Sequence, residues 1–124
     1  MRKAVSTPNA SPGGGPYSQA VVRGNQLFVS GQGPLDEQGR IRSGDIEAET
    51  RLTMDNIRTI VEAGGFTMDD VMQVSVYLAS LADFERFNAV YRTYFNPPFP
   101  ARSCVEAGLD GIKVEVDAIA CRTE

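Results

Sequence analysis

Histidine is absent from this chain of 124 residues, and its absence removes several familiar kinds of active site. Without histidine the chain cannot form a Ser-His-Asp or Cys-His catalytic site, a zinc site with histidine ligands, or the histidine pair of a metal-independent ribonuclease. Lysine is scarce as well, since only Lys3 and Lys113 occur, and a Schiff-base mechanism would depend almost wholly on Lys113. The side chains left for chemistry are those of arginine, cysteine, tyrosine and the carboxylates.

An excess of positive charge and a long apolar segment are also missing. Twelve Lys and Arg residues against sixteen Asp and Glu residues give a net charge of -4 and a pI of about 4.8. This balance argues against nucleic acid as the main partner. No apolar run approaches the ~20 residues needed to cross a bilayer, and Met1-Arg2-Lys3 leads into no signal-peptide stretch. We therefore expect a soluble, cytoplasmic protein without a membrane segment.

The length fits a single domain over residues 1–124. Residues 6–16 contain three prolines and three consecutive glycines, so we expect residues 1–16 to form a flexible or loop-like N-terminal arm. A domain of this size leaves little interior for a ligand cavity. Any sizeable pocket is therefore expected at a surface shared with another subunit.

Hydrophobic periodicity predicts several strands and two helices. Apolar residues recur at spacings of three and four after Asp45 and after Asp83, as in helices, whereas they alternate with polar residues in the strands. Gly24-Asn25 predicts a tight turn that joins the first two strands as a hairpin. The expected elements are strands at 18–23, 27–32, 74–79, 101–107 and 112–121, a further short strand near 40–42, and helices at 45–63 and 83–95.

These elements predict a two-layer α+β domain with both helices packed on one face of a mainly antiparallel sheet. Alternate residues of the last strand share the apolar face: Ile112, Val114, Val116, Ala118 and Ala120. The opposite face carries Lys113, Glu115, Asp117, Ile119 and Cys121. Because this second face mixes charged and apolar side chains, it suits a wall that a neighbouring subunit covers.

Arg102 and Glu115 are the candidate catalytic residues. Arg102 follows Phe99-Pro100-Ala101 at the start of a strand, where a rigidly held guanidinium can bind a carboxylate through two parallel hydrogen bonds. A surface or salt-bridged arginine is the alternative. Glu115 lies in the middle of a strand and is suited to accept a proton or to orient water. Its alternative is a cross-strand partner for a cation.

Whether the two candidates meet within the sheet depends on how the last two strands pair. A two-residue turn would place Cys104 opposite Glu115 and Arg102 opposite Asp117, with all four on one face. A three-residue loop at residues 109–111 would instead turn Glu115 to the other face. Cys104 has no histidine to activate it, so we interpret it as a small residue of the site wall.

Two adjacent strand motifs are specific: Phe99-Pro100-Ala101-Arg102-Ser103-Cys104-Val105 and, after a loop, Val114-Glu115-Val116. Weaker motifs precede them in the sequence: Gly15-Pro16-Tyr17-Ser18-Gln19, Ser30-Gly31-Gln32, Met54-Asp55-Asn56, and Phe84 to Asn88 with Tyr91. Together, in this order and over nearly the whole chain, the motifs resemble the RidA (YjgF/YER057c/UK114) family.

The resemblance implies a chorismate-mutase-like fold assembled as a homotrimer, with three clefts between adjacent subunits. It also implies hydrolysis of reactive 2-imino or enamine acids, such as 2-iminobutanoate and 2-iminopropanoate, to 2-keto acids and ammonia. Pyridoxal-phosphate dehydratases that act on serine and threonine release these acids, and no metal or cofactor is expected in their hydrolysis.

Carried over by position, Arg102 would bind the substrate carboxylate. Glu115, with backbone groups around Cys104, would hold the water that attacks the imine carbon. An iminium is already electrophilic, so this reaction needs mainly positioning and one proton acceptor. The residues expected to line the cleft are Tyr17, Ser30, Gly31 and Asn88.

Two features depart from the family pattern. Gly33 stands where relatives usually carry a bulkier aliphatic residue, which would widen the cleft or loosen the end of the strand. The segment between Val105 and Val114 is about two residues shorter than usual, a change that alters the rim of the cleft but keeps Glu115 on its face. The substrate range among small carboxylates is therefore open.

Other functions stay open beside the imine deaminase. One is a translation-inhibiting endoribonuclease, against which the negative charge and the lack of histidine argue. Another is a noncatalytic metabolite-binding or chaperone module, which would bind 2-keto acids without turnover. A third is a related deaminase acting in aromatic or pyrimidine breakdown.

Overall fold

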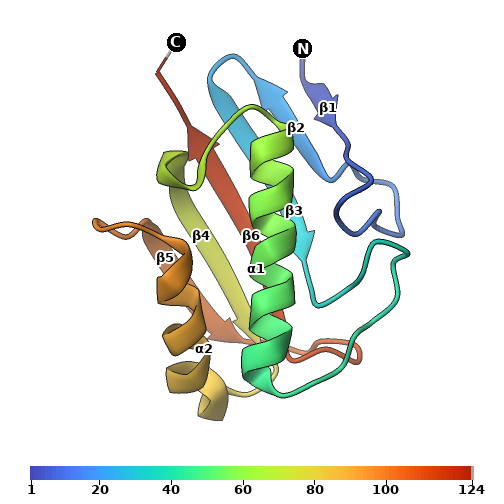
Figure 1. Cartoon of the computed structure of the whole chain (residues 1–124), viewed down its shortest axis with the longest axis vertical. Helices are drawn as coiled ribbons and strands as arrows, with labels where there is room; N and C mark the ends of the chain where they lie inside the picture. Colours follow the sequence, from blue (N-terminus) through green and yellow to red (C-terminus); the bar gives the residue numbers. More distant parts are fainter. Residues whose placement is uncertain (124) are drawn as a thin grey trace.

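A computed structural model describes residues 1–123, which form a six-stranded sheet with two helices in front of it (Figure 1). The strands are β1 (Lys3–Val5), β2 (Ala20–Arg23), β3 (Gln26–Gln32), β4 (Val71–Leu78), β5 (Ala101–Glu106) and β6 (Val114–Cys121). The helices are α1 (Ile46–Ala63) and α2 (Phe84–Tyr91), and short 3-10 turns occupy Met68–Asp70, Leu81–Asp83 and Arg92–Tyr94.

The strands lie side by side in the order β1-β2-β3-β6-β4-β5. Every neighbouring pair is antiparallel except β4 and β5, which are parallel. The predicted α+β class and the mainly antiparallel sheet are therefore confirmed. The hairpin predicted at Gly24-Asn25 is also present, because β2 pairs with β3 in a register that brings Arg23 opposite Gln26.

The hydrophobic core fills the space between the sheet and α1. The alternate residues of β6 predicted to be apolar, from Val114 to Ala120, are at most 2% exposed. They face the buried stripe of α1, whose members Met54, Ile57, Ile60 and Val61 are also at most 1% exposed. The alternate apolar residues of β6 and the apolar residues spaced three and four apart in α1 thus form two buried surfaces that pack together, as the sequence predicted.

Helix α1 begins and ends where its sequence signals stand. The Asp45 side chain caps the helix by accepting a hydrogen bond from the Ala48 amide at 2.8 Å. The chain leaves the helix through Gly64 and then Gly65, whose φ of 85° lies in the left-handed region that favours glycine.

A buried carboxylate ties the start of α1 to the start of β6. Glu49 is 1% exposed and accepts hydrogen bonds from the amides of Gly44 (3.2 Å) and Lys113 (2.8 Å). The Lys113 ammonium donates to the same carboxylate at 3.3 Å and to the Gly44 carbonyl at 2.8 Å. Lys113 therefore turns toward α1, and its predicted place on the other face of the sheet is wrong.

The N-terminal arm is more ordered than predicted. Lys3–Val5 forms β1, which pairs with β2, so the expectation of a purely loop-like arm over residues 1–16 is wrong for these residues. The buried side chain of Gln19 holds the segment that follows β1. Its amide oxygen accepts a hydrogen bond from the Thr7 amide, and its amide nitrogen donates to the Thr7 carbonyl and, at 2.7 Å, to the Ser11 carbonyl. The composition of the arm indicated turns but could not show that Gln19 satisfies its backbone groups.

Two other expected elements are shorter than predicted. The strand near residues 40–42 is reduced to a single bridge between Leu35 and Ile41. The helix expected over residues 83–95 is α-helical only for Phe84–Tyr91 and then tightens into a 3-10 turn. In both places only part of the predicted segment forms the regular hydrogen bonds of a strand or of an α-helix.

The last two strands do not form a hairpin, which corrects the sequence prediction most relevant to function. Strand β4 lies between β5 and β6 and pairs with both, through Val76 opposite Cys104 on one side and Val116 on the other. Neither hairpin register considered from the sequence forms: Cys104 does not pair with Glu115 nor Arg102 with Asp117, and no three-residue loop joins paired strands. Only the consequence of the second register, Glu115 on the other face from Arg102, is found.

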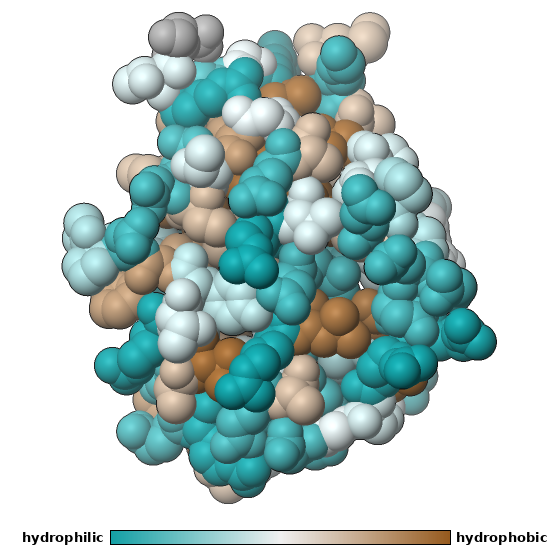
Figure 2. Space-filling view, in the orientation of Figure 1, coloured by the Kyte–Doolittle hydropathy of each residue, from teal (hydrophilic) through white to brown (hydrophobic). Residues whose placement is uncertain are grey.

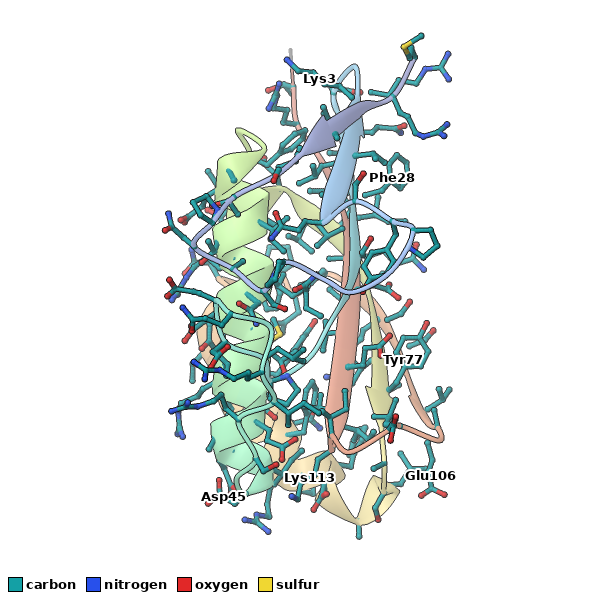
Figure 3. All side chains as sticks on the ribbon, turned by 90° about the vertical axis from the view of Figure 1, so that its right-hand side faces the viewer. Lys3, Phe28, Asp45, Tyr77, Glu106 and Lys113 are labelled. Atoms are coloured by element: carbon teal, nitrogen blue, oxygen red, sulfur yellow. The ribbon has the colours of Figure 1, made fainter. Side chains whose placement is uncertain are left out.

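The face of the sheet away from the helices is uncovered in the described part of the chain. Phe28 and Tyr77 point to this side in Figure 3, opposite α1. Phe28 is 41% and Val105 47% exposed there, which is high for apolar side chains of central and edge strands. By contrast, hydrophilic side chains dominate the outward surface of α1 in Figure 2. No described helix is long and apolar enough to span a membrane.

Candidate functional site

The candidate residues gather in two groups, which we call the arginine half-site (Asn88, Arg102 and Cys104) and the glutamate half-site (Tyr17, Ser30, Gly31 and Glu115). The arginine half-site lies between β5 and α2. The glutamate half-site lies where β3 ends beside β6. Each group contains residues far apart in sequence, so the fold assembles both.

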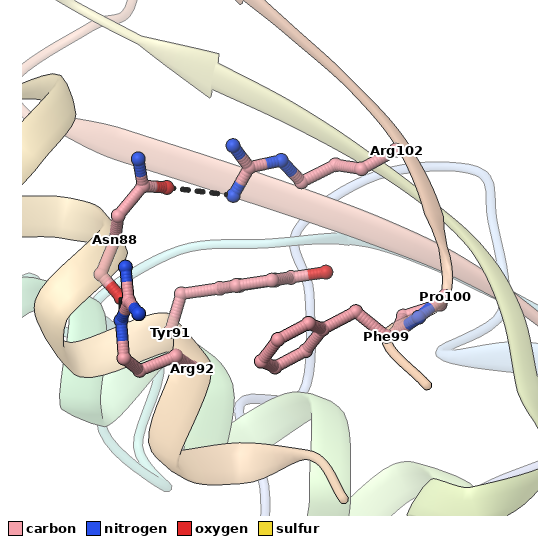
Figure 4. A pocket seen from close by; sticks show the side chains of 6 residues that line it. All are labelled: Asn88, Tyr91, Arg92, Phe99, Pro100 and Arg102. Carbon is pink, nitrogen blue, oxygen red and sulfur yellow. Dashed lines mark hydrogen bonds between the residues drawn. The ribbon is translucent and has the colours of Figure 1, made fainter. Parts of the chain in front are cut away.

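Arg102 is held in place by α2. Its Nη1 donates a hydrogen bond to the side-chain carbonyl oxygen of Asn88 at 2.8 Å (Figure 4). Its guanidinium carbon lies 4.8 Å from the centre of the Tyr91 ring and 5.6 Å from that of Phe84. Stacking on aromatic faces and a hydrogen bond to an amide orient the guanidinium without neutralising its charge.

A pocket of about 230 Å³ opens beside this guanidinium. Asn88, Tyr91, Arg92, Phe99, Pro100 and Arg102 line it (Figure 4). The lining contains two arginines and no carboxylate. Within residues 1–123, neither arginine forms an ion pair. The pocket is therefore suited to an anion, which would supply the missing countercharge.

The glutamate half-site depends on a bulge in β3. The register with β6 shifts between Val29 and Gln32, so Ser30 and Gly31 together lie opposite one residue of β6. Bulges re-aim side chains next to functional sites. Here a Cβ atom on Gly31 would overlap the Glu115 carboxylate, so the missing side chain of Gly31 makes room for that carboxylate.

A pocket of about 220 Å³ surrounds the Glu115 carboxyl, with Tyr17 and Gly31 in its wall. Partial burial, and secondly the nearby negative charge of Asp117, raise the pKa of Glu115 above its ordinary value. Asp117 also accepts a hydrogen bond from the Tyr77 hydroxyl at 3.3 Å. A carboxyl with a raised pKa is a stronger base once ionised, and it can return the proton at a pH closer to neutrality.

Tyr17 links the Glu115 pocket to Ser30, because it lines that pocket and also a second hollow that Ser30 lines. This second hollow is shallow and lies on the uncovered face of the sheet. The Ser30 hydroxyl donates to the Ser18 carbonyl at 2.6 Å, and the Tyr17 hydroxyl accepts from the Gly14 amide at 3.2 Å. Tyr17 is 55% exposed, so its ring is available to a ligand or to a second chain.

The two half-sites lie on opposite faces of the sheet within one chain. Arg102 pairs with buried Val74, which places its side chain on the helix face. Glu115 pairs with Tyr77, whose side chain lies on the uncovered face, while its neighbours Val114 and Val116 are buried under α1. A site in which both side chains of one chain contact the same small molecule is thus excluded.

Cys104 lies two residues from Arg102 on the same face of β5 and is partly buried. Burial raises the pKa of its thiol, with the Arg102 charge acting in the opposite direction. A thiol of raised pKa is a poor nucleophile near neutral pH. Cys104 is not among the residues that line the pocket beside Arg102, so its role in the wall of the site stays a prediction. Cys104 and Cys121 are both free thiols. Within residues 1–123, no three cysteine or carboxylate side chains converge as metal ligands.

Gly33 does not leave an open space. A Cβ atom at this position would lie 3.0 Å from the Ile112 side chain and 3.1 Å from that of Leu35, which fill the region. The Gly33 carbonyl accepts a hydrogen bond from the buried Asn56 amide at 3.1 Å. The strand end is therefore anchored, which argues against the expected loosening. Gly33 also lines the pocket beside Glu115, so its effect on the width of the cleft stays a prediction.

Sequence reasoning missed several residues of the arginine pocket. Tyr91 was named only in a family motif within the helix expected over residues 83–95, and Phe99 and Pro100 only as residues that precede Arg102. Tyr91 belongs to the hydrophobic core, whereas Phe99 is 50% exposed, and all three line the pocket together with Arg92. The available signal was the presence of two tyrosines, Tyr91 and Tyr94, among the aromatic residues of this helical segment, since a buried hydroxyl needs a partner.

Comparisons with known proteins agree over nearly the whole length of the chain. A family model described as Endoribonuclease L-PSP matches residues 7–122. A RutC family protein of Pyrococcus horikoshii is 43% identical over an alignment of 123 residues that covers 97% of this chain and 98% of the relative. The 2-iminobutanoate/2-iminopropanoate deaminase of Escherichia coli strain K12 is 39% identical over 127 residues, covering 98% of this chain and 99% of the relative. The crystal structure of Escherichia coli TdcF with bound serine has a TM-score of 0.91 at 35% identity, covering 98% of this chain and 99% of TdcF.

Proposed function

The chain belongs to the RidA family, whose family model is described as Endoribonuclease L-PSP, and on this premise we propose that it hydrolyses 2-imino and enamine acids to 2-keto acids and ammonia. The substrates we propose are 2-iminobutanoate and 2-iminopropanoate, which the Escherichia coli relative is named for. TdcF with bound serine supports a small molecule that carries a carboxylate next to a nitrogen-bearing carbon.

The observation that carries this proposal is the state of Arg102. Its guanidinium is held by the neutral amide of Asn88 and by aromatic rings, faces a pocket, and forms no ion pair within residues 1–123. A fixed, unneutralised guanidinium in a pocket binds a planar carboxylate through two charge-assisted hydrogen bonds. Arg102 would therefore hold the carboxylate and fix the position of the adjacent imine carbon.

Glu115 would supply the base. Its carboxylate takes a proton from water as the water oxygen bonds to the carbon of the protonated imine; the C=N electron pair moves to nitrogen, which gives a neutral 2-amino-2-hydroxy acid. Glu115 then gives that proton to the nitrogen. As the carbon–nitrogen bond breaks, the hydroxyl proton passes to the Glu115 carboxylate and from there to solvent, and ammonia leaves as the 2-keto acid forms. Backbone groups around Cys104, together with Tyr17, Ser30, Gly31 and Asn88, would line the site.

Because Arg102 and Glu115 lie on opposite faces of one chain, we propose that the complete site forms between copies. The arginine half-site of one copy would meet the glutamate half-site of the next, in a homotrimer whose subunits cover the exposed apolar side chains of the sheet, such as Phe28 and Val105. In this arrangement Arg102 of one copy and Glu115 of another would act on the same substrate, although the two side chains lie on opposite faces of each single chain.

The test is an assay coupled to a threonine or serine dehydratase. The wild-type chain should accelerate ammonia release from the imine product, and Arg102→Ala should reduce that acceleration roughly 100-fold, since two charge-assisted hydrogen bonds are lost. Arg23→Ala, which removes an exposed arginine of β2, is the control and should behave as wild type. Unchanged activity in Arg102→Ala would refute the proposal.

Because the matching family model is described as Endoribonuclease L-PSP, RNA cleavage is a second candidate activity. Incubation of the same preparation with RNA at low and high salt tests it, because binding to a polyanion weakens steeply with salt. RNA cleavage that persists in Arg102→Ala while imine hydrolysis is absent from the wild type would favour the ribonuclease over the deaminase.

A further inference from the structure

The hydroxyl of Tyr91 is buried without a hydrogen-bond partner among residues 1–123. Tyr91 is only 5% exposed. Two other tyrosines show the usual pattern, since the Tyr94 hydroxyl donates to the Asp55 carboxylate at 2.7 Å and the Tyr77 hydroxyl donates to Asp117. An unpaired buried hydroxyl destabilises a fold, so its presence calls for a reason.

Tyr91 cannot easily turn to find a partner elsewhere. Its ring packs against Phe87 with 5.4 Å between ring centres and against Phe95 with 5.0 Å. The Arg102 guanidinium covers another part of the ring. In Figure 4 the hydroxyl points into the space between Arg102 and Phe99, both of which line the anion-suited pocket. The other buried hydroxyl without a partner in the described residues 1–123, that of Thr53, does not line this pocket.

The chemistry of the neighbours defines what kind of atom would satisfy this hydroxyl. Burial raises the pKa of Tyr91 to about 12, so near neutral pH the hydroxyl keeps its proton and is a donor. Arg102 and Arg92, which share the pocket, carry donors only. The pocket thus presents several hydrogen-bond donors and few acceptors, and an anionic oxygen in it would accept hydrogen bonds from those donors.

We propose that Tyr91 is a further substrate-binding residue, whose hydroxyl donates a hydrogen bond to the carboxylate that Arg102 binds. This inference rests on the proposed function for the identity of the ligand. Arg102 would bind the carboxylate through its charge, and Tyr91 would fix the rotation of the carboxylate about its bond to the imine carbon. The hydroxyl that is unpaired in the free chain becomes paired in the complex.

The test compares Tyr91→Phe with wild type, because this substitution removes only the hydroxyl. The dissociation constant for 2-oxobutanoate, measured by calorimetry, should rise about tenfold, as for loss of a hydrogen bond to a charged group. The midpoint of thermal unfolding without ligand should stay equal or rise, since an unpaired buried polar atom is removed.

Tyr94→Phe is the matched control, three residues along the chain and outside the pocket. It breaks hydrogen bonds to Asp55 and to the Arg51 carbonyl, so its thermal midpoint should fall while its affinity for 2-oxobutanoate stays that of wild type. Equal affinity of Tyr91→Phe and wild type would overturn the assignment, as would a fall in its thermal midpoint comparable to that of Tyr94→Phe.

The two proposals fail in distinguishable ways. A wild-type chain that binds 2-oxobutanoate but releases no ammonia from any imine overturns the proposed reaction. The Tyr91 assignment depends instead on the ratio of keto-acid affinities between Tyr91→Phe and wild type, and a wild-type chain that binds no keto acid overturns the assignment.

Discussion

The Glu115 carboxyl shows how neighbouring residues set the strength of a candidate base. Desolvation and the charge of Asp117 both favour its protonated form and raise its pKa. The groups that face it come from three elements: Asp117 on β6 itself, Tyr77 on β4 and Gly31 on β3. In the proposed assembly, Arg102 of a neighbouring copy would act in the opposite direction and favour the carboxylate.

The pH dependence of hydrolysis should report this environment. If Glu115 must be ionised to accept a proton, kcat/KM falls as the pH drops through its raised pKa. Asp117→Asn removes one negative charge beside Glu115, which lowers that pKa and moves the acidic limb of the pH profile to lower pH. Asp110→Asn makes the same change in charge on an exposed loop and should leave the limb in place. A limb that does not move in Asp117→Asn would contradict the role of Glu115 as the base.

At the scale of elements, the bulge in β3 and the insertion of β4 create the two half-sites. The bulge places Ser30 and Gly31 against one residue of β6 and brings Gly31 to the Glu115 carboxylate. The insertion of β4 between β5 and β6 fixes Arg102 on the helix face. Strand periodicity predicted which residues of each strand share a face, but pairing partners are chosen by the whole sheet. A hairpin assumed from chain order was therefore wrong.

The fit at the bulge predicts the effect of one added methyl group. Gly31→Ala should displace the Glu115 carboxylate and lower kcat/KM by roughly 10- to 100-fold, because small misplacements of catalytic groups are costly. Stability should change little, since the displaced group is the end of a flexible side chain. Gly108→Ala is the control, because a Cβ atom there meets nothing within 4 Å. Equal catalysis by Gly31→Ala and Gly108→Ala would show that the close approach is irrelevant.

At the scale of the whole molecule, the two half-sites lie on opposite faces of the sheet, so a complete site would need one half-site from each of two chains. Arg102 points toward α2 and Glu115 points to the uncovered face, with the sheet between them. In the proposed trimer, each site combines the arginine half-site of one copy with the glutamate half-site of another. An inactive chain could therefore still donate one intact half-site.

Mixing two inactive variants tests this arrangement. Arg102→Ala and Glu115→Gln chains, unfolded together in equal amounts and refolded, should regain activity at about a quarter of the sites, because random assembly joins two intact half-sites with that probability. Each variant refolded alone should stay inactive. Sedimentation of the refolded mixture checks that the same oligomer forms, and no recovery within it would contradict a site shared between copies.

By itself, the sequence determined the family, the α+β class, the buried faces of α1 and β6 and the residues worth testing. These follow from local rules: alternation, helical spacing, caps such as Asp45, and motifs of adjacent residues. Only the tertiary structure decided that Arg102 and Glu115 lie on opposite faces, that Gln19 orders the N-terminal arm, and that the Tyr91 hydroxyl is unpaired beside a pocket. Those facts depend on which strands pair and which side chains meet across tens of residues, and such long-range choices are settled by the packing of the whole chain, not by any segment of it.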